Sequence, residues 1–174
     1  YFSKINFKIP KYSWDFRNKK GSSIIYDSIN NKKAYFYERS NDSNISKTIT
    51  TNNGVDLDGV NDFIITDLIN YGSSFTIEVY FKPDTSINDW ARVFSSAKPG
   101  EKWTNTDGYT FSRKSGSDDL GLYMENSERA SIVDFFTGNV NKHLVFSYNY
   151  ETKQIELSLN SNQFKFTYDG IDSV

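Results

Sequence analysis

Apolar and polar residues alternate along much of the chain. In the run 74–82, SFTIEVYFK, the apolar positions are Phe75, Ile77, Val79 and Phe81. The same alternation recurs in DLGLYME (119–125), QIELSLN (154–160) and QFKFTYD (163–169). A period of two places successive side chains on opposite faces of an extended strand, so these runs predict half-buried antiparallel strands. No window long enough for a helix shows a convincing helical stripe.

Turn-forming pairs separate the alternating runs. They are Asp58-Gly59, Tyr71-Gly72, Pro99-Gly100, Asp107-Gly108 and Asp169-Gly170. Two longer polar segments, 38–53 and 97–108, are expected to be loops, and NYETKQ (149–154) a short hairpin connection. About a dozen short strands would favour an all-β, two-sheet sandwich or jelly roll. We expect one domain over 1–174, cut from a longer protein because the chain begins at Tyr1 without Met.

Composition narrows the functional classes. Aromatic residues make up 17% of the chain, which agrees with a strand-rich fold. The net charge of −2, with scattered Lys and Arg, gives no basic surface for nucleic acid. No apolar run is long enough to insert into a membrane. The absence of cysteine excludes disulfides, zinc–thiolate sites and cysteine nucleophiles.

The order of several short motifs resembles a known family. GVDLDGVNDFIIT (54–66) is followed by SFTIEVYFKPD, WARVFSS, GYTFSRK, LGLYMEN and finally KHLVFSYNYETKQIELSLNSN. This order is similar to that of the concanavalin A-like, laminin-G-type (LamG, pentraxin-related) jelly rolls over roughly residues 14 to 168. The chain departs from the family pattern at Lys142 and at Asn160-Ser161-Asn162, which replaces an Asn-Gly turn. The resemblance implies a two-sheet antiparallel jelly-roll sandwich of the concanavalin A-like lectin/glucanase type, in an extracellular, cell-surface or virion protein.

The acidic stretch 56–62 allows three interpretations. A glycosidase would need carboxylates at alternating positions, but Val60 follows Asp56 and Asp58 where a third acid is required, so no catalytic residue is assigned. A calcium site would use the side-chain oxygens of Asp56, Asp58, Asn61 and Asp62, and the resemblance leaves calcium open as an ion the domain does not require. The favoured interpretation is a structural corner, in which Asp58-Gly59 forms the turn and Asn61-Asp62 binds the backbone.

Aromatic residues give the best candidates for a ligand site. Sugar rings have apolar C–H faces that stack on flat aromatics, and hydroxyls that need polar partners. Trp103 lies in a polar loop, and Tyr80 and Tyr123 fall on the polar faces of their strands. The predicted ligand-binding set is Glu101, Trp103, Asn105, Asp107, Tyr109, Tyr80 and Tyr123.

Other residues are expected to be structural. His143, the only histidine, matches a framework histidine of the family, and Trp14 and Trp90 are expected in the core.

We therefore expect a non-catalytic binding module of a larger surface or virion protein that recognises carbohydrate or a glycoprotein partner. One alternative is a structural or interaction domain of a virion, phage appendage or adhesin that binds no small ligand. A weaker alternative is a glycoside hydrolase or polysaccharide lyase of the same fold.

Overall fold

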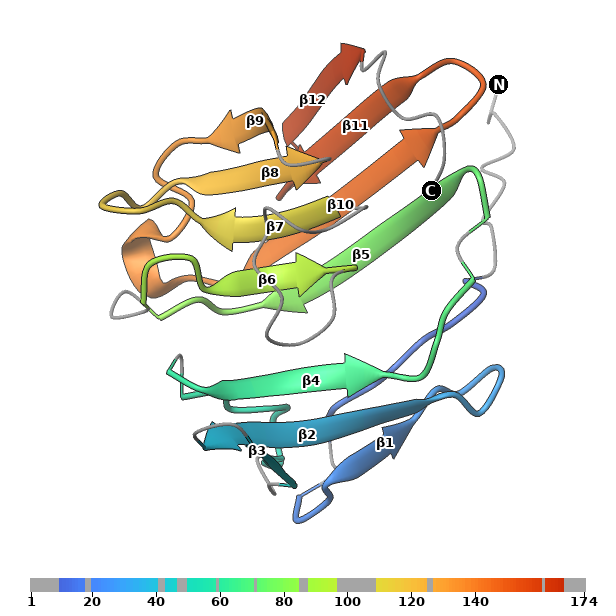
Figure 1. Cartoon of the computed structure of the whole chain (residues 1–174), viewed down its shortest axis with the longest axis vertical. Coiled ribbons are helices and arrows are strands. Elements are labelled where there is room, and N and C mark those ends of the chain that lie inside the picture. Colours follow the sequence, from blue (N-terminus) through green and yellow to red (C-terminus); the bar gives the residue numbers. More distant parts are fainter. Residues whose placement is uncertain are drawn as a thin grey trace, which may run out of the picture. The chain divides into compact units, whose positions relative to one another are not determined.

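The structure, a computed structural model, is all-β in the parts of the chain that it describes (Figure 1). These parts are residues 10–17, 20–40, 43–46, 50–58, 60–70, 72–84, 88–96, 109–124, 127–160 and 162–167. Their strands form three small antiparallel sheets, and none of the three closes into a barrel. The only helix in these ranges is the 3-10 turn η2 (Thr137–Asn139). No helix in these ranges has the length and apolar character needed to cross a membrane.

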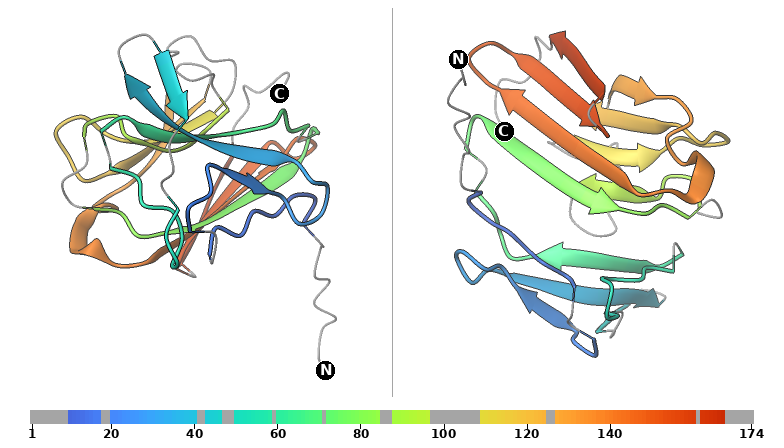
Figure 2. Two further views of the ribbon diagram at one scale, coloured as in Figure 1. Left: turned by 90° about the horizontal axis from the view of Figure 1, so that it is seen from below. Right: turned by 180° about the vertical axis from the view of Figure 1, so that it is seen from behind.

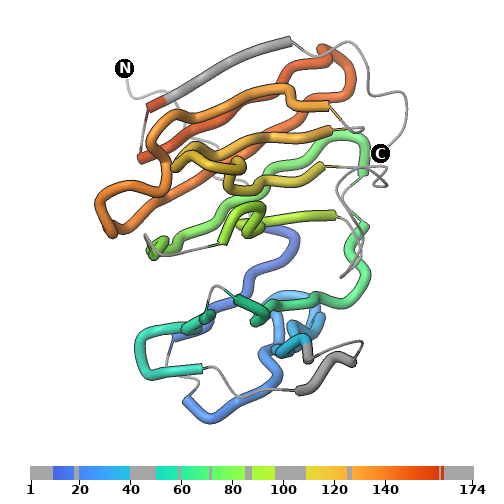
Figure 3. Tube along the Cα trace, turned by 60° about the vertical axis from the view of Figure 1, so that its left-hand side comes forward, coloured from blue at the N-terminus to red at the C-terminus, as the bar shows by residue number. Residues whose placement is uncertain are grey.

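The chain divides into two compact units, Tyr1–Ile69 and Asn70–Val174. The first unit holds one sheet, whose path can be followed by colour in Figure 3. Its strands are β1 (Ile24–Tyr26), β2 (Lys33–Ser40), β3 (Ser43–Ser46) and β4 (Asp62–Thr66). Strand β2 pairs with each of the other three strands. Ile25 and Phe36 are buried at the centre of its small apolar cluster, with Trp14, Phe16 and Ile64 packed against them.

The second unit holds two sheets, visible in the right-hand view of Figure 2. One has the order β12-β11-β10-β5 and is built from β5 (Phe75–Phe81), β10 (Lys142–Asn149), β11 (Gln154–Leu159) and β12 (Asn162–Thr167). The other has the order β6-β7-β8-β9 and is built from β6 (Arg92–Ser95), β7 (Tyr109–Arg113), β8 (Leu120–Met124) and β9 (Ser127–Ile132). For brevity we call these the β5 sheet and the β8 sheet.

Both sheets of this unit contribute side chains to one apolar cluster. Phe146 of the β5 sheet contacts two rings of the β8 sheet, with centroid distances of 5.0 Å to Phe111 and 5.6 Å to Tyr109. Phe75 adds a further contact to Tyr109 at 5.3 Å. Aromatic rings bury large apolar areas and favour such tilted contacts, so this cluster is the main source of stability in the unit.

The period-two pattern predicts burial correctly where one face of a strand meets solvent. Strands β5 and β10 alternate along their lengths, as expected from Phe75 to Phe81 and from Leu144 to Tyr148. The predicted hairpin between β10 and β11 is also confirmed. Strand β8 differs, because all five of its residues are buried, and the expectation of a polar, exposed face at Gly121 and Tyr123 is therefore wrong.

Candidate functional site

The acidic stretch 56–62 forms a turn held by its own side chains. The Asp58 carboxylate (Oδ1) accepts hydrogen bonds from the backbone N–H groups of Val60 at 2.9 Å, and of Asn61 and Asp62 at 3.1 Å each. In return, the Asp62 carboxylate accepts a hydrogen bond from the backbone N–H of Asp58 at 3.1 Å. These are the side-chain-to-backbone bonds of a structural corner, as the favoured interpretation predicted.

The amide of Asn61 ties this turn to the neighbouring strand. Its Nδ2 donates to the backbone carbonyl of Arg39 at 2.9 Å and to Glu38 Oε1 at 3.4 Å. Asp56 is exposed at the other end of the turn. Among the described residues, no three His, Cys, Asp or Glu side chains are grouped as a metal ion would need. A calcium site here would have to compete for an Asp58 oxygen that already accepts three N–H groups, and calcium binding stays a prediction.

The predicted ligand-binding residues separate into three groups. Four of them, Glu101, Trp103, Asn105 and Asp107, lie outside the described residues. Two, Tyr109 and Tyr123, are buried. Tyr80 alone, of the three that the structure describes, is exposed, at 69%.

Tyr109 belongs to the core. It opens β7 on the same face as Phe111 and is 1% exposed. Its ring stacks on Phe94 with a centroid distance of 5.7 Å and an interplanar angle of 8°. Because Tyr109 follows a polar loop in the sequence, it was expected to be accessible. In the structure it lies on the inward face of β7, so its ring points into the core. Its expected role as an accessible ligand contact is therefore corrected to a packing role.

Tyr123 lies on the face of the β8 sheet that does not contribute to the cluster. Its ring covers Gly121, where an added Cβ would come within 2.6 Å of the ring. Burial raises the pKa of the Tyr123 phenol, and the negative charge of Glu128 raises it further. Tyr123 is 6% exposed, so its ring can pack behind a neighbouring side chain but is not accessible as a ligand-binding surface itself.

Tyr80 is the centre of the candidate site, on the face of the β5 sheet that does not contribute to the cluster. It lies directly opposite His143 in the β5–β10 pairing, with a centroid distance of 6.4 Å between the rings. The His143 Nε2 atom lies 2.7 Å from Glu78 Oε1. Cross-strand pairs of this kind fix side-chain direction on a sheet face. A flat ring is thus held beside a carboxylate and an imidazole that can accept and donate hydrogen bonds.

Hydroxyl groups continue this polar face along the same strands. Thr76 and Ser147 lie opposite each other, and their side-chain oxygens are 2.9 Å apart. We call Thr76, Glu78, Tyr80, His143 and Ser147 the Tyr80 face. An exposed aromatic ring beside Glu78 and His143, with hydroxyls farther along the same face, suits a ligand with one apolar face and a rim of hydroxyls.

His143 was expected to be a framework residue of the resembled family, and that role stays a prediction. Its side chain is 41% exposed and lies beside Glu78, so it is also accessible to a ligand. Its structural contact is made by the backbone, whose N–H donates to Asn160 Oδ1 at 2.8 Å. The alternation in β10 could have indicated this position, since Leu144 and Phe146 occupy the opposite face.

The sequence also misplaced Trp90. It was expected in the core, but it is 42% exposed and lies in the turn before β6. The neighbouring apolar Ala91 and Val93 suggested a buried strand. The preceding Asn88-Asp89 pair, which favours turns, was the signal against that interpretation.

Comparisons of the chain with protein-family models, with curated proteins and with solved structures found no match.

Proposed function

We propose that this chain is a non-catalytic binding module that recognises carbohydrate, free or on a glycoprotein, as part of a larger surface or virion protein. The Tyr80 face carries this proposal. Its ring is exposed on the outer face of the β5 sheet, near the end of β5 and beside the Glu78–His143 pair. Stacking of a sugar ring on Tyr80, with hydrogen bonds from its hydroxyls to Glu78 and His143, needs no catalytic group and no metal ion.

We also propose the finer fold assignment, a two-sheet jelly-roll sandwich of the concanavalin A-like, laminin-G type, for the unit Asn70–Val174. The shared cluster between the β5 sheet and the β8 sheet supports it. In such a fold the sheet faces outside the core are free to carry ligand sites.

A glycan array tests the binding proposal. Wild-type protein should bind a subset of glycans, and Tyr80→Ala should weaken that binding because the stacking ring is lost. Tyr26→Ala is the matched control, since Tyr26 is also an exposed tyrosine, at 53%, but belongs to β1 of the first unit. Equal loss in both variants would indicate a general effect on the protein and not a site.

A second candidate function is a structural or interaction domain that packs against neighbouring proteins. The first unit exposes the apolar side chains of Val60, at 72%, and Leu68, at 91%. They lie beyond opposite ends of β4, so each is available for a protein contact but the two do not form one contiguous patch. An array on which wild-type protein binds no glycan would favour this second function over the first.

A further inference from the structure

We propose that the second unit carries a second carbohydrate-binding site, in which Trp90 stacks on the apolar face of a pyranose ring. This site is separate from the Tyr80 face. The proposal rests on the carbohydrate-binding function, but it assigns a different residue, in the turn before β6 of the β8 sheet and not on a strand of the β5 sheet.

The position of the Trp90 ring suits it to stack against the apolar face of a sugar ring. Its ring lies beside that of Tyr123, with a centroid distance of 6.0 Å and an interplanar angle of 57°. Tyr123 is itself buried, and its ring occupies the space over Gly121 that a side chain would otherwise fill. Trp90 therefore has a buried ring behind it and part of its own surface open to solvent.

The backbone at Trp90 adopts a conformation that bulky residues avoid. Its φ is 66°, in the left-handed region, where a large side chain is strained. Strain of this kind persists only where surrounding contacts impose it, and it occurs preferentially at binding and catalytic sites. Two backbone hydrogen bonds impose it here, from Trp90 N–H to the Arg113 carbonyl at 3.1 Å and from Arg113 N–H to the Ala91 carbonyl at 2.9 Å.

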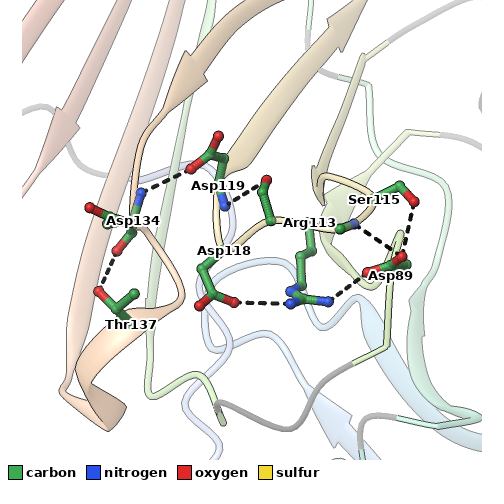
Figure 4. A network of polar contacts seen from close by, with 9 residues as sticks. Asp89, Arg113, Ser115, Asp118, Asp119, Asp134 and Thr137 are labelled. Atoms are coloured by element: carbon green, nitrogen blue, oxygen red, sulfur yellow. Dashed lines mark hydrogen bonds and ion pairs between the residues drawn. The ribbon is translucent and has the colours of Figure 1, made fainter.

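Asp89 fastens the same turn to the hairpin between β7 and β8 (Figure 4). One carboxylate oxygen accepts a hydrogen bond from Arg113 at 2.7 Å, and the other accepts from the Ser115 hydroxyl at 2.9 Å and from the Gly116 N–H at 3.1 Å. Two of these hydrogen bonds lower the pKa of Asp89 below its ordinary value. The bond from the Ser115 hydroxyl has the larger effect, and the bond from the Gly116 N–H has the next largest. The other terminal nitrogen of the Arg113 guanidinium, Nη2, donates a hydrogen bond to Asp118 Oδ1 at 3.0 Å. The turn is thus ordered before any ligand arrives, which reduces the entropy cost of binding.

The charged groups around the Trp90 ring favour a sugar over a nucleic acid. The Lys114–Glu128 ion pair, at 2.9 Å, lies beside Tyr123, and Arg92 is exposed next to the turn. These groups can bind hydroxyls around a ring that stacks on Trp90. The carboxylates of Asp89 and Glu128 would repel the phosphates of a nucleic acid, and they already pair with the neighbouring cations Arg113 and Lys114.

The test compares Trp90→Gly and Trp90→Phe on the same array. Glycine adopts a φ of 66° without strain, so Trp90→Gly removes the ring while leaving the turn its conformation. We expect about a tenfold loss of affinity for glycans that use this site, and recovery of much of it in Trp90→Phe, which keeps a ring. Tyr150→Ala is the control within the same unit, since Tyr150 is exposed at 37% in the β10–β11 connection, and it should bind as wild type does.

Three outcomes distinguish this site from the Tyr80 face. Binding that survives Tyr80→Ala but is lost in Trp90→Gly supports the second site. Wild-type binding that is unchanged in Trp90→Gly overturns the second site and leaves the Tyr80 proposal intact. Wild-type protein that binds no glycan overturns both proposals.

A direct measurement covers the case in which Trp90→Gly fails to fold. Wild-type protein labelled with 5-fluorotryptophan should give one ¹⁹F resonance for each of its three tryptophans. Trp90→Phe assigns the Trp90 resonance. Adding an oligosaccharide whose binding on the array survives Tyr80→Ala should shift this resonance, and a titration to saturation without any shift at Trp90 would overturn the proposal.

Discussion

The carboxylate of Asp27 offers a test of how the first unit is held together. It is 1% exposed, and it accepts hydrogen bonds from the backbone N–H groups of Ser13, Ile29 and Asn30. These bonds join the segment before β1 to the turn that follows it. Burial acts to raise the pKa of Asp27, but the hydrogen bonds from Ser13, Asn30, Ile29 and Lys32 outweigh burial and hold the pKa below its usual range.

The size of the effect follows from these bonds. A hydrogen bond to a charged group contributes about 1.5–3 kcal/mol, and part of this is offset by the cost of burying the carboxylate. Ile29 and Asn30 lie at the surface, where water can replace a lost acceptor. We therefore expect Asp27→Ala to lower the free energy of unfolding by about 2–4 kcal/mol. Asp27→Asn keeps one acceptor oxygen and should cost about half as much.

The sign of the pH dependence is also fixed. Because the pKa is lower in the folded state, ionised Asp27 stabilises the fold above its unfolded pKa of about 3.9, and this contribution is lost as the pH falls through the folded pKa. Urea unfolding at about pH 7 and at lower pH should show a larger acid loss in wild type than in Asp27→Asn. Hydrogen exchange at Ser13, Ile29 and Asn30 should become faster in both variants. Equal acid loss in wild type and Asp27→Asn, with unchanged exchange, would refute the reasoning.

Three further substitutions have defined outcomes. Phe146→Ala should lower the free energy of unfolding by about 3–5 kcal/mol, because the ring of this β5-sheet residue packs against rings of the β8 sheet. A loss below about 1 kcal/mol in chemical denaturation would contradict this packing. Asp58→Ala should lower the free energy of unfolding by about 1–2 kcal/mol in thermal melts with EDTA present, because the Asp58 carboxylate no longer accepts three hydrogen bonds from backbone N–H groups. Destabilisation seen only with millimolar calcium would identify a metal site instead. Trp103→Ala should weaken glycan binding by about 1–3 kcal/mol with little change in melting temperature if the ring is displayed, whereas a stability loss of about 3–5 kcal/mol would place it in the core.

Local patterning predicted those parts of the fold that local chemistry determines. The strands β5 and β10 follow the alternation, and the Asp58 turn follows the ability of aspartate to bind its own backbone. The alternation at 119–125 also predicted strand β8, but it did not predict that the second face of this strand is buried, which depends on residues distant in sequence. The division of the chain into two compact units was not anticipated either, and the expected single domain over 1–174 stays a prediction.

The candidate site was predicted less well, for a related reason. Tyr80 was identified correctly as an outward residue, since the face it shares with Glu78 follows from the period of β5. Trp90 was missed because its exposure depends on a left-handed backbone imposed by Arg113, about twenty residues away. Tyr109 and Tyr123 illustrate the same limit, since which face of β7 or β8 is covered depends on tertiary packing.

Titration calorimetry of wild-type protein and Tyr80→Ala, with the glycan that binds best on the array, tests the proposed function. We expect wild-type protein to bind and Tyr80→Ala to lose about 1–3 kcal/mol of binding free energy, or roughly 5–150-fold in affinity, with an unchanged melting temperature because Tyr80 is exposed. Tyr26→Ala should bind as wild type does. Identical affinity in wild type and Tyr80→Ala would contradict the assignment of the ligand to the Tyr80 face.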